Sequence, residues 1–207
     1  MARDAAARAL AGAAIIVAAA ALWAIWGPPP EVRLAPVAWT DIAPPAPVAL
    51  RPWTTIVIHH SAAPVGDPAG IDRHHAVERK WDGIGYHFVI GNGHGMPLGR
   101  IEATFRWRGQ SHGAHAGDEA VNQRGIGICV IGDFERAPPD PRLADRLADL
   151  CAVLIEHCGA LSVESIVGHK DVKASTLCPG AHLDLGALRA LVRTKLAARA
   201  AAGVAAP

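Results

Sequence analysis

Apolar side chains along residues 53–196 form short runs that predict strands, separated by longer stretches with helical spacing. The four strand-like runs are Thr54–His60, Gly85–Ile90, Gly125–Gly132 and Ser165–Gly168. The third run, GIGICVIG, is almost wholly apolar, which is typical of a strand covered on both faces, so we expect it at the centre of a sheet. Asn92-Gly93 predicts a tight turn that returns the second strand through Met96–Gly99 as a hairpin.

Helical spacing is clearest from Asp140 to about Gly159, where aspartate suits the N-cap, Pro141 the first turn and glycine the exit. Its apolar stripe consists of Leu143, Leu147, Leu150, Cys151, Leu154, Ile155 and Cys158. A shorter helix is predicted over Ile71–Lys80, and a last one over about Leu183–Ala197. Together these elements indicate the α/β class, with a central mixed β-sheet flanked by helices.

The N-terminus has a different composition. Residues 9–27 contain no charge, and a helix of this length would span roughly 28 Å, enough to cross a bilayer core. Arg3 and Arg8 precede it, which predicts that residues 1–8 stay in the cytoplasm and the rest is exported. We expect a single transmembrane signal anchor in the inner membrane, with the domain in the periplasm or extracytoplasmic space. The alternative is secretion after signal-peptide cleavage near Ala18–Ala21.

The stretch between this segment and the domain is rich in proline. Residues 28–52 carry eight prolines, which disfavour helix and sheet pairing, so we expect a semi-rigid spacer that holds the domain off the membrane. The folded domain is expected over 53–196. From about Ala197 the chain is rich in alanine, and we expect 197–207 to fray as a tail.

Charge limits the classes of partner. The formal net charge is +1 and both signs are scattered along the chain, so no basic stripe predicts binding to nucleic acid. Eleven histidines is a high number for 207 residues, and several cluster with glycines and the single tyrosine, Tyr86. This clustering indicates a functional site on a domain that we expect to be monomeric.

Three potential zinc ligands are divided along the chain. His59 ends the first strand-like run, and His169 and Cys178 lie much later in GHKDVKASTLCPG. A catalytic zinc site typically has three protein ligands of this kind and a fourth position for water, so metal-assisted hydrolysis is the first hypothesis. His60 should point to the opposite face from His59, so at most one of the two binds metal directly. The alternative interpretation is a strand-end histidine buried or solvated for packing reasons.

Six segments make the chain resemble a known family. They are IVIHHS at 56–61, WDGIGYHFVI at 81–90, GR at 99–100, GAHA at 113–116, NQRGIGICVIGDF at 122–134 and GHKDV with TLCPG within 168–180. Their order over about residues 53–190 resembles the zinc-dependent N-acetylmuramoyl-L-alanine amidases of the peptidoglycan recognition protein type, which include the phage amidase lysozymes.

The resemblance implies a role for individual residues. His59, His169 and Cys178 match the ligands of one zinc ion. Tyr86 matches the family's catalytic tyrosine, and Thr176 stands where members carry Thr or Lys near the reacting carbonyl. The positions that match residues lining the peptidoglycan groove are His75, Arg79, His115 and Asn122. For the first two of these, four residues apart on the predicted helix, the alternative is a solvated helix face.

The implied activity is that of a zinc hydrolase, an N-acetylmuramoyl-L-alanine amidase that cleaves the amide bond between N-acetylmuramic acid and L-alanine. Its partners would be peptidoglycan and, through the N-terminal helix, the membrane. The alternative is a non-catalytic peptidoglycan-binding module, although members without the cysteine ligand tend to be the receptors and this chain keeps Cys178. A zinc peptidase would fit the metal but not the groove residues.

The other cysteines are Cys129, Cys151 and Cys158. Some members carry glutamate at the position of Cys129, and its absence indicates the branch that depends on tyrosine. Cys151 and Cys158 lie about 10 Å apart along one predicted helix, too far for a disulfide. Cys129 could meet either of them, and an exported compartment permits a disulfide, but we expect buried free thiols.

Overall fold

The computed structural model of the protein describes residues 34–203. The predicted cytoplasmic tip at 1–8, the predicted signal anchor at 9–27 and residues 204–207 lie outside the described residues. Within 34–203, no helix is both long enough and apolar enough to cross a membrane.

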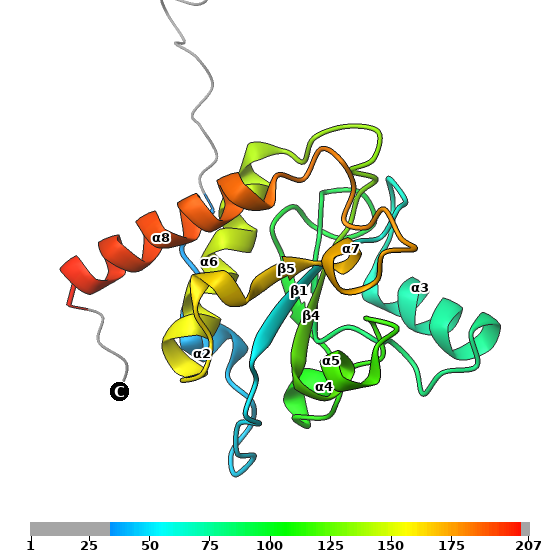
Figure 1. Cartoon of the computed structure of the whole chain (residues 1–207), viewed down its shortest axis with the longest axis horizontal. Coiled ribbons are helices and arrows are strands. Elements are labelled where there is room, and N and C mark those ends of the chain that lie inside the picture. Colours follow the sequence, from blue (N-terminus) through cyan, green and yellow to red (C-terminus); the bar gives the residue numbers. More distant parts are fainter. Residues whose placement is uncertain (1–33, 204–207) are drawn as a thin grey trace, which may run out of the picture. The chain divides into compact units, whose positions relative to one another are not determined.

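Among residues 34–203, five strands form one mixed sheet (Figure 1). In chain order they are β1 (Thr55–His60), β2 (Phe88–Ile90), β3 (Ile101–Ala103), β4 (Gly125–Val130) and β5 (Ile166–Gly168). Their spatial order is β3-β2-β4-β1-β5. The pairings of β4 with β1 and β2 and of β1 with β5 are parallel, whereas β3 runs antiparallel to β2. The predictions of a mixed sheet and of a central apolar strand, β4, are confirmed.

Alternation of side chains divides the two faces of the sheet. Ile56 and Ile58 of β1 belong to the main hydrophobic core, together with Ile126 and Ile128 of β4. His59 follows Ile58 and therefore points to the other face, where the register pairs it with Cys129 of β4. The chemistry of interest thus lies on the face opposite the main core.

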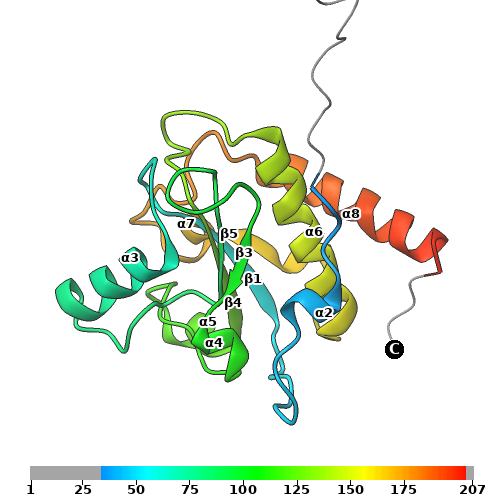
Figure 2. The same cartoon turned by 180° about the vertical axis from the view of Figure 1, so that it is seen from behind.

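Two long helices cover the face with the main core (Figures 1 and 2). α6 (Pro141–His157) begins as predicted, because the Asp140 carboxylate accepts a hydrogen bond from the Arg142 backbone N–H at 2.8 Å. α8 (Leu185–Ala201) is capped by Asp184 in the same way. Leu143, Leu147, Leu150, Cys151, Leu154 and Cys158 of the predicted α6 stripe are buried.

The alanine-rich end of the chain is helical for longer than predicted. α8 continues to Ala201, so the expected tail over 197–207 is wrong for 197–201. Arg199 donates to the Glu156 carboxylate at 2.8 Å and to the Val37 carbonyl at 3.2 Å. These contacts with distant segments hold the last turn, which the local composition did not indicate.

Residues 34–52 pack on the domain instead of forming a spacer. α2 (Trp39–Ile42) forms within them, and Val37 and Ile42 are 1% and 3% exposed within the main core. The Trp107 indole N–H also donates to the Ile42 carbonyl. The prediction of a spacer over 28–52 is wrong for this part, because Pro36 and Pro44 flank α2 rather than interrupt it.

The predicted hairpin forms with a different return strand. Gly93 closes the turn by donating to the Met96 carbonyl at 2.9 Å. The chain pairs again only at β3, because residues 96–100 form a second loop in which Gly99 donates to the Gly91 carbonyl at 2.8 Å. Pro97 lies inside the predicted return strand and cannot donate to a ladder, which explains the later start.

On the other side of the sheet, the helix predicted over Ile71–Lys80 begins earlier and changes type (Figures 1 and 2). α3 (Pro68–Arg73) continues directly into a π-helical turn, η1 (His74–Glu78). The Arg79 N–H binds the His74 carbonyl, five residues back, at 3.2 Å. Single π-turns are frequent at functional sites. The other described helices are α4 (Phe105–Arg108), α5 (Glu119–Arg124), η2 (Val163–Ser165, 3₁₀) and α7 (His169–Val172).

Candidate metal centre and adjoining cleft

The three predicted zinc ligands converge at the carboxyl ends of two strands. His59 lies near the end of β1, His169 follows β5 at the start of α7, and Cys178 lies in the next loop. One potential ligand atom from each lies within 4.8 Å of the others. Because β1 and β5 are parallel neighbours, their ends meet and place the two histidine rings 4.5 Å apart.

Backbone hydrogen bonds hold the cysteine above the strand ends. Cys178 Sγ lies 3.7 Å from His59 Nδ1 and accepts a hydrogen bond from the His60 N–H at 3.4 Å. The Cys178 carbonyl accepts from the Lys170 N–H at 2.7 Å, and the Cys178 N–H donates to Thr176 Oγ1 at 3.2 Å. The structure therefore places Thr176 in the turn that positions the metal ligand.

The two histidines direct their Nε2 atoms away from the centre of the trio. His59 Nε2 lies 3.1 Å from His115 Nδ1, and His169 Nε2 lies 3.2 Å from the Ala116 carbonyl oxygen. Burial lowers the pKa of His59 well below its ordinary value, and the neighbouring His115 and His169 lower it further. Burial also lowers the pKa of His169. Both rings are therefore neutral at pH 7 and can offer a lone pair to a metal.

The chemistry of this donor set fits zinc. Two imidazoles and one thiolate are typical zinc ligands, whereas magnesium and calcium require oxygen. Burial raises the pKa of the Cys178 thiol to about 11, so a bound metal must displace its proton. Three protein ligands leave a fourth coordination position for a reactant, as in catalytic zinc sites.

A cleft of about 510 Å³ opens beside the trio. The predicted site residues that line it are His75, Arg79, Tyr86, His115, Asn122 and His169. None of its lining residues is acidic, and Arg79 and Lys173 give it positive charge. A second cavity of about 360 Å³ shares Tyr86 and His75 with it and continues toward α3. The two cavities provide space on both sides of Tyr86.

Tyr86 lies between the metal ligands and the cleft. Its ring centroid is 5.0 Å from that of His59 and 5.5 Å from that of His75. Burial raises the pKa of the phenol well above its ordinary value, and the nearby Cys129 thiol, with which it shares a hydrogen bond, raises it further. The hydroxyl therefore keeps its proton at neutral pH and can act as a hydrogen-bond donor.

The π-turn η1 supplies one wall of the cleft. His75 is buried; its Nδ1 accepts a hydrogen bond from the Gly85 N–H at 3.0 Å, and its ring lies 4.7 Å from that of Trp81. Burial, followed by the charge of His74, lowers the pKa of His75 to about 4. Arg79 is exposed at the rim. Both predicted residues of this helix thus face the cleft.

His115 and Asn122 also face the cleft, but most of their polar contacts are internal. His115 is buried, with Nε2 at 3.1 Å from the Gly125 carbonyl oxygen. Burial lowers the pKa of His115 to about 4. Asn122 Oδ1 accepts hydrogen bonds from the backbone N–H groups of His115 and Ala116, both at 2.9 Å.

Sequence reasoning missed several residues that line the cleft, namely Ser61, His74, Trp81 and Lys173. Two of these had a signal. Ser61 ends the segment IVIHHS and Trp81 opens the segment WDGIGYHFVI, so their proximity to Tyr86 could have been inferred. Lys173 had none, because it reaches the cleft only through the fold of the loop between His169 and Cys178.

The four cysteines are unpaired. Cys129, Cys151 and Cys158 are buried, and burial raises the pKa of Cys151 to about 12. The prediction of buried free thiols is confirmed. Cys129 lies beside Tyr86 at the position where glutamate would otherwise stand, so in this chain the tyrosine has a neutral thiol as its neighbour.

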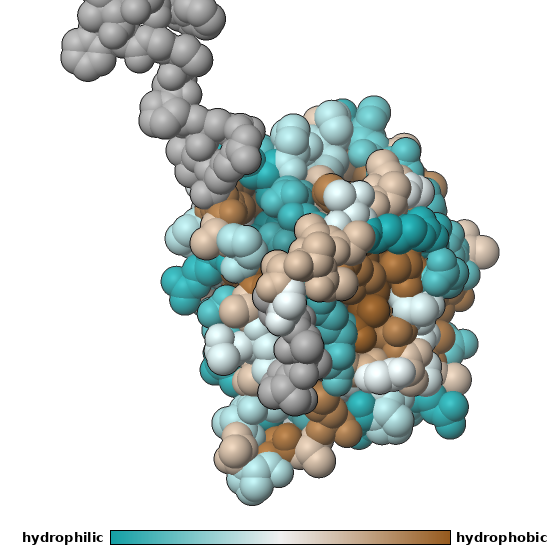
Figure 3. All heavy atoms as spheres, turned by 90° about the vertical axis from the view of Figure 1, so that its left-hand side faces the viewer, coloured by the Kyte–Doolittle hydropathy of each residue, from teal (hydrophilic) through white to brown (hydrophobic). Residues whose placement is uncertain are grey.

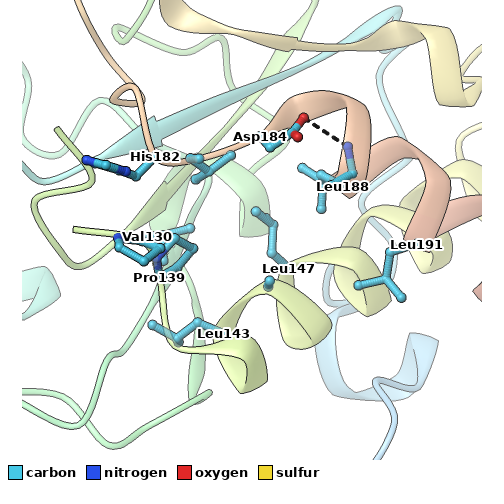
Figure 4. Close-up of a pocket in the computed structure, with 12 residues that line it drawn as sticks. Val130, Pro139, Leu143, Leu147, His182, Asp184, Leu188 and Leu191 are labelled. Atoms are coloured by element: carbon cyan, nitrogen blue, oxygen red, sulfur yellow. Dashed lines mark hydrogen bonds between the residues drawn. The ribbon is translucent and has the colours of Figure 1, made fainter. Parts of the chain in front are cut away.

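An apolar cavity of about 240 Å³ lies apart from this site, between α6 and the start of α8. Hydrophobic residues gather beside α8 in the space-filling view (Figure 3), and Leu147 of α6 and Leu188 of α8 face each other in the close-up (Figure 4). The Asp184 carboxylate at its edge caps α8. It shares no lining residue with the cleft and offers no polar group to a reactant.

Comparison with known proteins points in one direction. The family model described as N-acetylmuramoyl-L-alanine amidase matches residues 49–181. A short peptidoglycan-recognition protein of Drosophila melanogaster is 32% identical over 149 residues, which cover 69% of this chain and 76% of that protein. The endolysin amidase LysCS from Clostridium intestinale has a TM-score of 0.59 at 30% identity, covering 68% of this chain and 84% of that chain. A mutant of Drosophila PGRP-LB in complex with tracheal cytotoxin has a TM-score of 0.52 at 26% identity, covering 71% and 89%.

Proposed function

Because the chain belongs to the N-acetylmuramoyl-L-alanine amidase family, we propose that it is a zinc-dependent hydrolase of peptidoglycan. The bond cleaved is the amide between N-acetylmuramic acid and L-alanine. The observation that carries the proposal is the convergence of His59, His169 and Cys178 beside Tyr86 at the end of a cleft.

Zinc held by these three residues would supply a Lewis acid that polarises the amide carbonyl and lowers the pKa of water to about 7. Tyr86 complements it, because its phenol stays protonated and can donate to the carbonyl oxygen as negative charge develops. Thr176 accepts a hydrogen bond from the Cys178 N–H and keeps its own hydroxyl proton for a second donation near the same carbonyl. Neither residue needs to change its protonation state to perform this role.

The cleft suits a branched, partly anionic polymer. Arg79 and Lys173 can bind carboxylates of a stem peptide, while the exposed Trp81 offers a flat apolar surface to a sugar or peptide. The continuous space on both sides of Tyr86 allows the glycan and the peptide to extend in opposite directions from the scissile amide. His75, buried between Trp81 and Tyr86, shapes the junction of the two cavities.

The second candidate function is recognition of peptidoglycan without catalysis. It is favoured by the similarity to proteins named for recognition, such as the Drosophila relative that is 32% identical to this chain. The presence of Cys178 and Tyr86 in bonding positions at the trio favours hydrolysis instead, because a purely binding groove needs neither a thiolate ligand nor a buried phenol donor.

One experiment distinguishes the two. The purified full chain is incubated with peptidoglycan, and released stem peptides with free L-alanine amino termini are identified by mass spectrometry. We expect release that stops on chelation and returns when zinc is added back. Sedimentation with peptidoglycan but no release, at full zinc occupancy, would support the binding module and contradict the hydrolase.

We further propose that the enzyme acts outside the cytoplasm as a membrane-anchored monomer. The support is the uncharged segment at 9–27 with Arg3 and Arg8 before it. Peptidoglycan is found on that side of the membrane, so the proposed substrate and the proposed location agree.

A further inference from the structure

One loop of the structure touches both histidines of the trio. His115, in the loop Gly113–Ala116, places Nδ1 3.1 Å from His59 Nε2. The next residue, Ala116, places its carbonyl oxygen 3.2 Å from His169 Nε2. The two metal ligands come from different strands, yet their outer nitrogens are bonded by neighbouring residues of the same loop.

These bonds determine where the ring protons lie. A carbonyl oxygen only accepts hydrogen bonds, so the bond between His115 Nε2 and the Gly125 carbonyl, 3.1 Å long, requires a proton on that Nε2. In the neutral ring the lone pair is then on His115 Nδ1, which accepts from His59 Nε2. His59 therefore carries its proton on Nε2 and presents the lone pair of Nδ1 toward Cys178 Sγ, 3.7 Å away.

The same reasoning applies to the second histidine more directly. Because the Ala116 carbonyl can only accept, His169 carries its proton on Nε2 and leaves the lone pair of Nδ1 for a metal. Both histidine ligands are thus held in the one tautomer that can bind metal through Nδ1.

We propose that the loop Gly113–Ala116 sets the tautomer of both histidine ligands, with His115 as the positioning residue for His59. The proposal rests on the zinc site of the proposed function. It gives His115 and Asn122 a role behind the metal, in place of the groove-lining role that their motif positions suggested. His115 needs no contact with substrate for this role.

Asn122 holds the loop in place. Its Oδ1 accepts from the N–H groups of His115 and Ala116, both at 2.9 Å, and its carbonyl accepts from the Gly113 N–H at 2.8 Å. A further bond joins the Ala114 N–H to the Gly85 carbonyl at 3.0 Å, one residue before Tyr86. Every residue of the loop therefore has a backbone bond that fixes its position relative to the metal ligands.

The ring of His115 lies in a slot made by two glycines. A Cβ added at Gly113 or at Gly127 would lie 2.4 Å from His115 Cδ2, closer than any real contact. The glycines of GAHA and GIGICVIG thus leave the space that brings His115 against His59. His87, whose ring centroid lies 5.7 Å from that of His115, packs on it from another side.

The tautomers can be read directly in the zinc-free protein. The full chain is labelled with ¹⁵N at histidine, kept in detergent with a chelator, and the ring nitrogen shifts of His59 and His169 are assigned with single variants. We expect both rings as the Nε2–H tautomer. A dominant Nδ1–H form of either ring would overturn the proposal, and this measurement requires no variant of the loop itself.

The second test is zinc affinity, measured by competition with a chromophoric chelator. His115→Phe keeps a ring but removes the acceptor, and we expect a loss of about 10–100-fold in affinity, the usual effect of removing such an outer partner. His115→Asn is the matched control, because its Oδ1 stands near the position of Nδ1 and can accept from His59; it should recover most of the affinity. Wild-type affinity in His115→Phe would contradict the proposal.

The loop anchor offers an independent pair of variants if His115→Phe fails to fold. Asn122→Leu removes the acceptor of both loop N–H groups, whereas Asn122→Asp keeps it. We expect zinc affinity to fall in the first and to be retained in the second. Equal affinity in both variants would overturn the role of Asn122.

These measurements contain no substrate, so they can fail or succeed independently of the proposed function. If the expected tautomers and affinities are found but peptidoglycan is not cleaved, the hydrolase proposal fails and the loop proposal stands. If His115 variants raise KM for peptidoglycan fragments with unchanged zinc affinity and unchanged tautomers, His115 is a groove residue and the loop proposal fails.

Discussion

At the scale of single residues, Tyr86 is the side chain whose chemistry can be isolated most cleanly. Tyr86→Phe removes one oxygen and keeps the ring that packs against His59 and His75. We expect turnover of peptidoglycan to fall about 10²–10³-fold, the usual effect of removing one donor to a developing oxyanion. Zinc content and KM should change little, because the bond strengthens mainly in the transition state. Near-wild-type turnover would reduce Tyr86 to a packing role.

Cys178 supports a second prediction at this scale. Cys178→Ser replaces the thiolate donor by a neutral hydroxyl, a far poorer zinc ligand. We expect loss of stoichiometric zinc on dialysis and loss of amidase activity, with the fold retained, because Cys178 is only partly buried. Cys151→Ser is a suitable control, since it removes a thiol from α6 on the other face of the sheet. Full zinc content in Cys178→Ser would exclude the trio as the metal site.

At the scale of elements, α2 shows that the proline-rich segment is part of the fold. Ile42→Ala should destabilise the domain by about 2–4 kcal/mol, because Ile42 is 3% exposed within the main core. Val48→Ala, in the same segment but 38% exposed, is the matched control and should change stability by less than about 0.5 kcal/mol. Urea unfolding of the two variants measures the difference. Equal effects would show that residues 34–52 do not contribute to the core in solution.

The π-turn is the other informative element. In η1 the wider turn brings His74 and His75 to the cleft together with Arg79. The periodicity of residues 71–80 predicted a helix but not its π-turn, because a π-turn arises from contacts such as the one between His75 Nδ1 and the Gly85 N–H. The same bond ties the wall of the cleft to the segment that carries Tyr86.

At the scale of the whole molecule, buried neutral histidines make the zinc-free fold sensitive to acid. Burial lowers the pKa of His59, His87 and His115, whereas histidines of the unfolded chain titrate near 6.5. Below that pH the unfolded state binds more protons, so stability present above pH 6.5 is lost as pH falls toward the lower pKa values of the folded state. Three such groups should together cost about 3–4 kcal/mol between pH 6 and pH 5.

Urea unfolding of the full chain in chelator at several pH values measures this slope. His115→Asn removes one of the three titrating groups and should reduce the slope by about a third. A free energy of unfolding that stays constant from pH 6 to pH 5 would contradict the burial of these rings.

Orientation across the membrane is a prediction that depends on the whole chain. If Arg3 and Arg8 keep the N-terminus inside, a reporter fused after residue 207 should be active only in the exported compartment, and the protein should sediment with membranes. Replacing both arginines with glutamate should reduce correct insertion. Full-length protein in the cytosolic fraction would refute the anchor, and a shortened soluble form outside the cell would indicate cleavage.

Much of the sheet could be predicted because strand periodicity is local. The uninterrupted apolar run at Gly125–Val130 identified the central strand, and the caps Asp140 and Pro141 identified the start of α6. The return strand of the hairpin was wrong because a turn signal at Asn92-Gly93 does not say where pairing resumes. The end of α8 was wrong because Arg199 is held by partners far away in the sequence.

The sequence by itself determined the kinds of chemical group in this protein: two histidines and a cysteine that can bind zinc, one tyrosine, and the motifs that place the chain in its family. Only the tertiary structure decided how these groups act together. The parallel pairing of β1 and β5 brings His59 to His169, and the fold of the loop Gly113–Ala116 bonds both rings from behind. The physical reason is that periodicity and turn chemistry act between near neighbours, whereas the tautomer of a buried histidine depends on partners that the chain brings from more than fifty residues away.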